Sequence, residues 1–315
     1  MGTAHRSHGR VAPHAGGRLR NHHGVMATTG AARIARIGKR YVKPVVSDQV
    51  WLTAKTSVRT FLGRRIEDGA PPRGDMHYLD FLRELHTVVQ PATYLEIGVR
   101  WGSSLALSRT RSLGIDPAYN ITSELDLPLR LERTTSDEYF AREDACRWLG
   151  GPVEMAFIDG MHLFEYALRD FINVERHSRR SSVIVFDDML PRTTDEAARE
   201  KHTDSWTGDV YHVHEVLRQE RPDLTLIVVD TAPTGLLLVT NLDAESTVLE
   251  DRYDEFVAAY SSSDPQPVPR RVLDRQGARH PAEVLASPAW EALRAYREAS
   301  PPLGAVGFPH FESLT

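Results

Sequence analysis

The chain has 315 residues, of which 41% are hydrophobic and 26% are charged, and its formal net charge is -5. These values are typical of a soluble globular protein that has one α/β domain with extensions. The only cysteine, Cys146, excludes an intramolecular disulfide and a cysteine-based metal site and fits the reducing cytoplasm. No apolar run approaches the roughly 20 residues needed to cross a bilayer.

The N-terminal segment, residues 1–47, is basic, and no acidic residue precedes Asp48. Its His, Gly, Ala and Arg content offers little surface to bury, so we expect a disordered leader. A basic arm of this kind can also contact nucleic acid or a membrane. It lacks the apolar core of an export signal, which argues against secretion.

The globular pattern begins near Asp48. Apolar residues at helical spacing predict a helix over 76–89, and Pro91 stops it. Short apolar runs then predict strands, and amphipathic segments between them predict helices. The strands are expected at 92–99, 112–115, 129–133, 153–158 and 182–186, and the helices at 103–111, 136–149, 164–176 and 212–219. Buried strands that alternate with helices indicate a parallel sheet.

The last two predicted strands, 224–229 and 235–240, differ from the others. The link between them is too short for a helical crossover, so they must run antiparallel. The sequence therefore predicts an α/β fold with a Rossmann-like, doubly wound, mostly parallel seven-stranded sheet and an antiparallel strand near its end. We expect this domain to span 48–243 and a helical and linker extension to span 244–315, including a helix at 248–260.

A glycine turn follows the first predicted strand, in the segment Glu96-Ile-Gly-Val-Arg-Trp-Gly102. Gly98 and Gly102 let the backbone approach a ligand, and the N–H groups that follow favour an anionic group. Ligands of open parallel sheets bind at such strand ends. The spacing fits neither the dinucleotide fingerprint nor a Walker loop. The alternative is a tight turn that serves geometry only.

The pattern E-x-G-x-x-x-G resembles the first motif of class I S-adenosylmethionine-dependent methyltransferases. The second strand ends in Gly114-Ile-Asp116, an acid about twenty residues after the glycines, where a ribose diol is held in related folds. The resemblance implies that Glu96 and Ser104 lie near the methionine part of the donor. It also implies that Asp116 holds the ribose and that Ser136 lies beside the base.

Two further strand ends carry acidic residues, in Phe157-Ile-Asp159-Gly-Met-His162 and Val185-Phe-Asp187-Asp188. The carboxyl ends of parallel strands share one edge, so the three aspartates are expected to converge beside the methyl donor. Hard oxygen ligands suit Mg²⁺ or Mn²⁺. The alternative is that they cap helices, but three crowded carboxylates would repel each other without a cation. His162 is suited to accept a proton from a hydroxyl.

These two segments resemble the small-molecule O-methyltransferases of the macrocin O-methyltransferase and cephalosporin-hydroxylase-like group. The resemblance covers roughly residues 94–242 and implies that Asp159, Asp187 and Asp188 hold magnesium and that His162 is the base. It implies transfer of a methyl group to a hydroxyl of a sugar, a polyketide or an aromatic ring. Trp206 and Tyr211 either line the acceptor pocket or serve packing.

Three other functions stay open at this stage. A donor-binding module would keep Gly98 and Asp116 and transfer nothing. A hydroxylase-like enzyme on the same fold would need an iron site, which normally takes two histidines and a carboxylate, and only His162 is placed for that. A nucleic-acid methyltransferase would need a basic face on the folded domain, so no nucleic-acid partner is expected. The sequence identifies neither the acceptor nor the oligomeric state.

Overall fold

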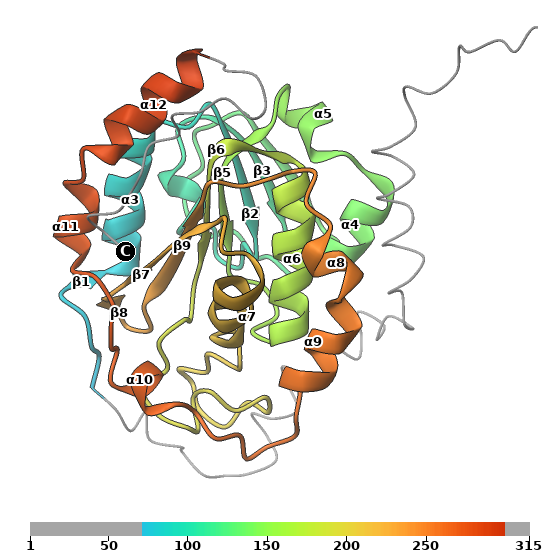
Figure 1. Ribbon diagram of the computed structural model, residues 1–315. Helices are drawn as coiled ribbons and strands as arrows, with labels where there is room; N and C mark the ends of the chain where they lie inside the picture. Colours follow the sequence, from blue (N-terminus) through green and yellow to red (C-terminus); the bar gives the residue numbers. More distant parts are fainter. Residues whose placement is uncertain (1–70, 300–315) are drawn as a thin grey trace, which may run out of the picture.

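The computed structural model describes residues 71–299, so the predicted leader lies outside the described residues. Seven strands form one sheet in the order β4-β3-β2-β5-β6-β9-β7 (Figure 1). Their bounds are Thr93–Ile97 (β2), Arg111–Ile115 (β3), Leu129–Glu132 (β4), Val153–Ile158 (β5), Ser178–Phe186 (β6), Thr225–Val229 (β7) and Leu236–Thr240 (β9).

The strand directions confirm the predicted fold class. The pairs from β4 through β6 are parallel, whereas β9 runs antiparallel to both of its neighbours, β6 and β7. The short link from β7 to β9 forces this reversal, because it has no room for a crossover helix. The middle strands β2, β5 and β9 are buried along their whole length, as expected for strands covered on both faces.

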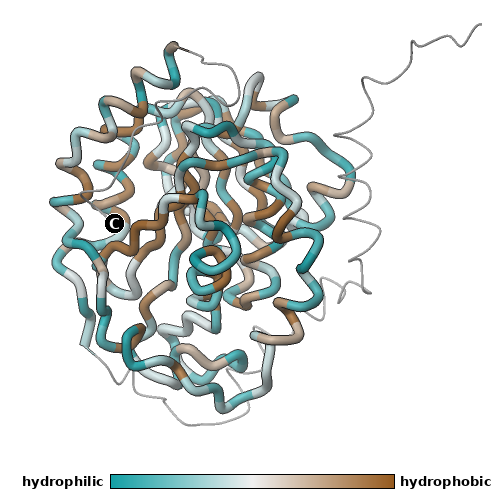
Figure 2. Tube along the Cα trace, viewed as in Figure 1, coloured by the Kyte–Doolittle hydropathy of each residue, from teal (hydrophilic) through white to brown (hydrophobic). Residues whose placement is uncertain are grey.

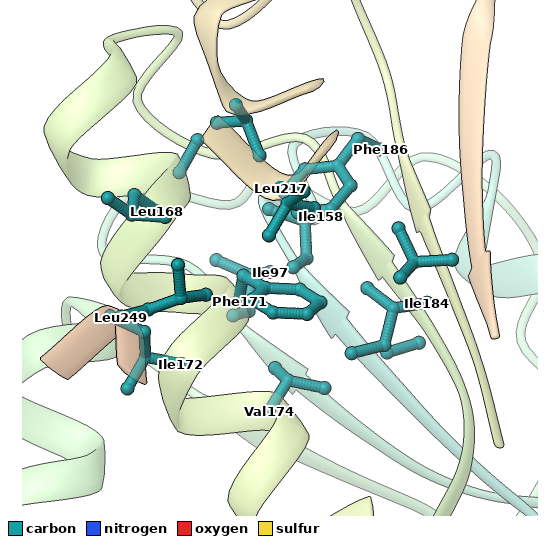
Figure 3. Close-up of a cluster of buried hydrophobic side chains, with 14 of the residues drawn as sticks. Ile97, Ile158, Leu168, Phe171, Ile172, Val174, Ile184, Phe186, Leu217 and Leu249 are labelled. Atoms are coloured by element: carbon teal, nitrogen blue, oxygen red, sulfur yellow. The ribbon is translucent and has the colours of Figure 1, made fainter. Parts of the chain in front are cut away.

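Helices cover both faces of the sheet (Figures 1 and 2). One face carries α3 (Tyr78–Val89), α11 (Pro281–Leu285) and α12 (Ala289–Ala299). The other face carries the helices that build the larger hydrophobic cluster shown in Figure 3. These are α4 (Ser136–Arg142), α5 (Ala145–Leu149), α6 (Phe164–Arg176), α7 (His212–Glu220), α8 (Val248–Asp251) and α9 (Tyr253–Tyr260). Residues after 244 thus contribute helices to both faces.

Three predicted helices differ from the structure. The predicted helix at 103–111 is only a 3-10 turn, η1 (Leu105–Leu107), because the chain becomes extended at Ser108 to enter β3. The predicted helix at 136–149 is split into α4 and α5, since Asp144 leaves the helical conformation and caps α5 through Cys146 N–H. The predicted helix at 248–260 is interrupted at Arg252.

Three features had no counterpart in the sequence pattern. Strand β6 begins four residues earlier than predicted, through the polar run Ser178-Arg-Arg-Ser181. A small parallel pair joins β1 (Met76–His77) to β8 (Thr231–Ala232), ahead of α3. A short helix, α10 (Arg270–Leu273), lies in the C-terminal extension. Among the described helices, none has the length and apolar character needed to cross a membrane.

Candidate active site

Four of the predicted site residues form a row at the carboxyl edge of the sheet. Gly98, Asp116, Asp159 and Asp187 each follow the last residue of a strand. Their backbone N–H groups donate to the last carbonyl of the neighbouring strand, at 2.9, 3.1, 2.8 and 3.1 Å respectively. The sheet ladder therefore fixes the spacing between the glycine turn and the aspartates, as the parallel topology predicts.

Gly98 follows strand β2 and packs against the backbone of Asp159, which follows strand β5. Its φ is +91°, and a Cβ atom added there would lie 1.8 Å from the backbone oxygen of Asp159. Only glycine fits such a position without moving the backbone. Close packing alone therefore requires glycine at this position. The same packing brings the glycine turn into direct contact with the loop that carries Asp159.

Glu96 lies beneath this turn and is fully buried. Its two carboxylate oxygens accept hydrogen bonds from the Tyr94 hydroxyl at 2.7 Å and the Ser104 hydroxyl at 2.8 Å. Burial raises the pKa of Glu96 to about 8, against the opposing effect of these two hydrogen bonds. A cationic group bound beside Glu96 would favour its ionised form.

Asp116 and Ser136 both have protein partners. The Asp116 carboxylate accepts from the backbone N–H of Arg100 at 2.8 Å and of Ala118 at 2.5 Å. It therefore braces the glycine turn, where Arg100 adopts a φ of +49°. Ser136 begins α4, and its side chain hydrogen bonds to Asp170. Both residues lie at the predicted edge, and their contacts with a ligand stay predictions.

A histidine lies between two of the aspartates. His162 Nδ1 is 2.7 Å from Asp188 Oδ2, and His162 Nε2 is 3.2 Å from Asp159 Oδ1. One ligand atom from each of these three residues lies within 4.8 Å of the others. Burial alone would lower the pKa of His162, but Asp188 and Asp159 raise it well above its ordinary value. The imidazolium thus provides a positive charge between the two carboxylates.

Asp187, the third predicted metal ligand, lies beside this group and outside it. Its Oδ1 accepts from the backbone N–H of Asp188 at 2.8 Å. Burial, and then the charges of Asp188 and Asp159, raise the pKa of Asp187 well above its ordinary value. The group whose ligand atoms lie within 4.8 Å of one another thus contains His162 beside Asp159 and Asp188. The role of Asp187 as a metal ligand stays a prediction.

The segment that includes this edge matches a known protein family. Residues 95–189 match the sequence model of a methyltransferase domain. The chain carries a methyltransferase domain. The match runs from β2 to the end of β6 and contains the glycine turn, Asp116 and the aspartates, and it confirms the methyltransferase prediction. No curated protein sequence matches the chain.

Several solved structures resemble the chain at low identity. The O-methyltransferase TomG from Streptomyces achromogenes, involved in tomaymycin synthesis and solved with SAM, is 17% identical, covers 67% of this chain and 96% of its own, and has a TM-score of 0.38. An O-methyltransferase from Bacillus cereus with SAH is 16% identical, with coverages of 67% and 97% and a TM-score of 0.36. The MycE methyltransferase of the mycinamycin pathway, with Mg and SAH, is 16% identical, with coverages of 68% and 55% and a TM-score of 0.37. Because these TM-scores are low, the assignment rests on the family match.

Two residues near the aspartates of the methyltransferase domain escaped the sequence analysis. Tyr78 begins α3, and its pKa is raised by burial and then by the charges of Asp187 and Asp159, so the phenol lies within electrostatic reach of these carboxylates. The sequence around Tyr78 gives no sign of its position near the aspartates, because the residue fits the pattern of an amphipathic helix.

Asp170 is the second. It is 2% exposed, and burial, followed by the charge of Asp137, raises its pKa to about 7. It lines a small cavity together with Asp159, His162 and Asp188, and its Oδ1 atom has no hydrogen-bond partner. One feature of the sequence could have identified Asp170: it is a carboxylate on the apolar face of the helix predicted at 164–176.

The segment after β6 closes over His162. The Trp206 ring stacks on the imidazole with centroids 5.2 Å apart and an interplanar angle of 9°. Its indole Nε1 donates to the backbone oxygen of Ala198 at 2.6 Å. Tyr211 is buried, and its ring lies 4.2 Å from that of His212. Of the two aromatic residues proposed for an acceptor pocket, Trp206 contacts the reactive edge and Tyr211 packs inside.

Proposed function

We propose that the chain is an S-adenosylmethionine-dependent O-methyltransferase that acts on a hydroxyl group of a small molecule. The observation that carries the proposal is the position of His162. An imidazole held between two carboxylates lies on the same sheet edge as the glycine turn of a methyltransferase domain. A base and a donor site at adjacent strand ends suit the transfer of a methyl group to an oxygen that must lose its proton.

The glycine turn and its neighbours suit the donor. Gly98 and Gly102 keep the backbone open. The ammonium and sulfonium groups of the donor would favour the ionised form of the buried Glu96, whose carboxylate then offers them negative charge. Asp116 lies at the next strand end, where it can accept from the ribose hydroxyls, and Ser136 lies beyond it at the start of α4. We infer that these side chains, with Ser104 behind Glu96, form the donor site.

The aspartates suit a divalent cation. Asp159, Asp187 and Asp188 bring three carboxylates to one edge. Burial and then the charges of the other two aspartates raise the pKa of Asp187, and the His162 imidazolium compensates this repulsion in part. Carboxylate oxygens are the ligands that Mg²⁺ and Mn²⁺ prefer. The three aspartates would hold the ion, which when bound supplies positive charge beside the acceptor oxygen and lowers the pKa of its hydroxyl.

His162 performs the proton transfer in this proposal. Its Nδ1 faces Asp188 and the Trp206 backbone oxygen, both of which are acceptors, so the Nδ1–H stays on the ring. In the free protein Asp188 and Asp159 keep the ring protonated. A cation bound to these carboxylates would lower the pKa of the ring. Nε2 would then release its proton to solvent and be able to take the hydroxyl proton while the methyl group passes from sulfur to oxygen. General-base catalysis of this kind contributes about 10²- to 10⁴-fold. Trp206 limits the rotation of the ring and covers its face.

The test is a transfer assay with donor labelled in its methyl group. Hydroxylated sugars, polyketides and catechols are offered as acceptors, with Mg²⁺ or with a chelator. We expect label in a hydroxyl-bearing product and a loss of about 10²-fold or more in His162→Ala. His280→Ala, which changes an exposed histidine at the start of α11, is the control and is expected to behave like the wild type. Label in amine acceptors or in nucleic acid, with none in hydroxyl acceptors, would contradict the proposal.

A further inference from the structure

The lid, defined as residues 190–211, contacts the His162 loop at three points. The Trp206 ring stacks on the His162 ring. Gly208 packs so closely that a Cβ atom there would lie 1.6 Å from the His162 backbone oxygen. The Asp209 Oδ1 atom accepts from the backbone N–H of Phe164 at 2.8 Å, at the start of α6. The lid therefore contacts the side chain, the backbone and the downstream helix of the proposed base.

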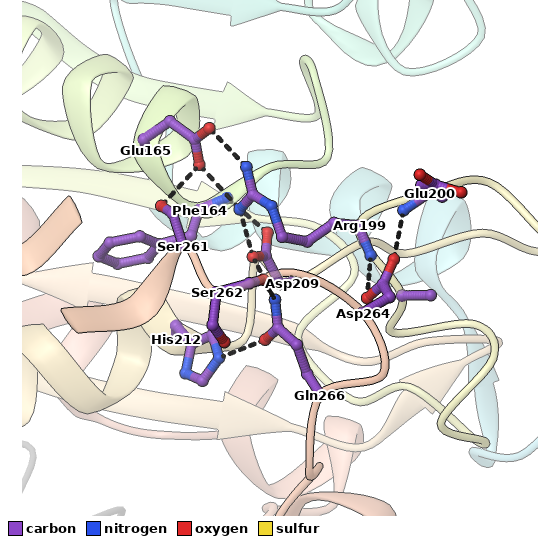
Figure 4. Close-up of polar contacts among 12 residues, drawn as sticks. Phe164, Glu165, Arg199, Glu200, Asp209, His212, Ser261, Ser262, Asp264 and Gln266 are labelled. Carbon is purple, nitrogen blue, oxygen red and sulfur yellow. Dashed lines mark hydrogen bonds and ion pairs between the residues drawn. The ribbon is translucent and has the colours of Figure 1, made fainter. Parts of the chain in front are cut away.

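Asp209 is the inner anchor of these contacts. Its side chain is fully buried, and its Oδ2 atom pairs with Arg199 NH1 at 2.5 Å (Figure 4). The same guanidinium binds Glu165, in the first turn of α6, at 2.6 and 3.0 Å. A buried carboxylate without a partner is costly. Burial raises the pKa of Asp209, and the Phe164 N–H and the Arg199 guanidinium oppose that effect, while Asp209 accepts from the first N–H of α6.

The C-terminal extension completes the arrangement. The strap, defined as residues 261–266, lies against the lid (Figure 4). Asp264 accepts from the backbone N–H groups of Arg199 at 3.0 Å and of Glu200 at 2.8 Å. Gln266 Nε2 reaches Asp209 Oδ2 at 3.4 Å and Gln266 Oε1 lies 3.2 Å from His212 Nε2. Both the lid and the strap lie outside residues 95–189, which match the methyltransferase domain.

The backbone of His162 needs such support. Its φ is +59°, in the left-handed region. A non-glycine residue is strained in that region and persists there only when its surroundings fix it. If the lid moved away, the loop would relax and the ring would leave the gap between Asp159 and Asp188.

We propose that Asp209 and Arg199 are positioning residues for His162, and that the strap, through Asp264 and Gln266, keeps them in place. The catalytic importance of this arrangement rests on the proposed function. The arrangement itself is a property of the folded chain, measurable without any turnover. The active site is accordingly incomplete without the C-terminal extension. A misplaced base of this kind lowers the transfer rate by about 10- to 100-fold while donor binding is unchanged.

The experiment follows the ¹⁵N signals of the His162 imidazole by NMR in the full chain, with His162→Gln used for assignment. Asp209→Asn keeps an acceptor for the Phe164 N–H but loses the charge pair with Arg199. Asp264→Ala acts only from the strap and leaves the core intact. The matched control is Glu175→Gln, which breaks a buried pair with Arg221 at 2.8 and 2.9 Å, on the far part of α6.

We expect Asp209→Asn and Asp264→Ala to shift or broaden the His162 signals and to lower the turnover number 10- to 100-fold, with donor affinity by calorimetry within about twofold of wild type. Glu175→Gln should destabilise the fold in urea yet leave the His162 signals and turnover as in wild type. Unchanged His162 signals in both Asp209→Asn and Asp264→Ala would overturn the inference. If the wild type binds no donor, the proposed function fails, and the imidazole signals still decide the positioning role.

Discussion

Replacement of Gly98 by alanine tests the coupling between the glycine turn and the aspartate loop. The added Cβ would stand 1.8 Å from the Asp159 backbone oxygen, at a φ of +91°. Left-handed backbone strain costs about 1–2 kcal/mol and steric overpacking about 1–3 kcal/mol. The lower entropy of the unfolded alanine chain offsets about 0.4–1 kcal/mol. The expected net loss of unfolding free energy is about 1–5 kcal/mol.

Two other glycines separate these contributions. Gly277 has a φ of +80° with no atom within 4 Å of an added Cβ, so Gly277→Ala isolates the backbone strain. Gly151 has neither a left-handed φ nor a close neighbour, and Gly151→Ala should stay within about 0.5 kcal/mol of wild type. Urea unfolding gives the three free energies. The reasoning is refuted if Gly98→Ala loses no more stability than Gly277→Ala.

Three further predictions concern α6 and the lid. Because the pKa of Asp170 rises to about 7 in the fold, its stabilising contribution is full below pH 4 and is lost as the pH rises towards 7. Asp170→Asn should therefore flatten the decline in unfolding free energy over this range, by up to about 4 kcal/mol, and an unchanged slope would contradict the assignment. Phe171→Ala removes a fully buried ring (Figure 3) and should cost about 3–5 kcal/mol in urea unfolding, whereas a loss below 1 kcal/mol would mean the site is not packed. Trp206→Ala should reduce methyl transfer more than Trp206→Phe, which keeps a ring over His162; equal rates would deny the stacking a role.

The sequence predicted the fold best where burial dictates the pattern. Strand β5 and helix α6 have the predicted bounds, because one is an unbroken apolar run and the other has strong helical periodicity. The reversal at β9 followed from the length of the link before it. The first residues of β6 were not predicted. Ser178 and its polar neighbours belong to the strand because Ser178 pairs with Val153, and this pairing exists only in the folded chain.

The sequence predicted those site residues whose positions the parallel sheet determines. Gly98, Asp116 and Asp159 lie in one row because parallel strands end at one edge. The insertion of His162 between two aspartates depends on a left-handed backbone that the lid maintains, and no local sequence signal encodes it. Arg199 is remote in sequence from the residues it supports, and such a contact shows only when the chain is folded.

A calorimetric titration of S-adenosylmethionine, with Mg²⁺ and with chelator, shows whether the chain binds the methyl donor. We expect saturable binding to the wild type and to the control Asp254→Asn, an exposed substitution on α9. Asp116→Asn should bind at least about tenfold more weakly, because it loses a charged hydrogen-bond acceptor for the ribose. The conservative change is needed since Asp116 also braces Arg100. Absence of donor binding to the wild type under both conditions would contradict the account.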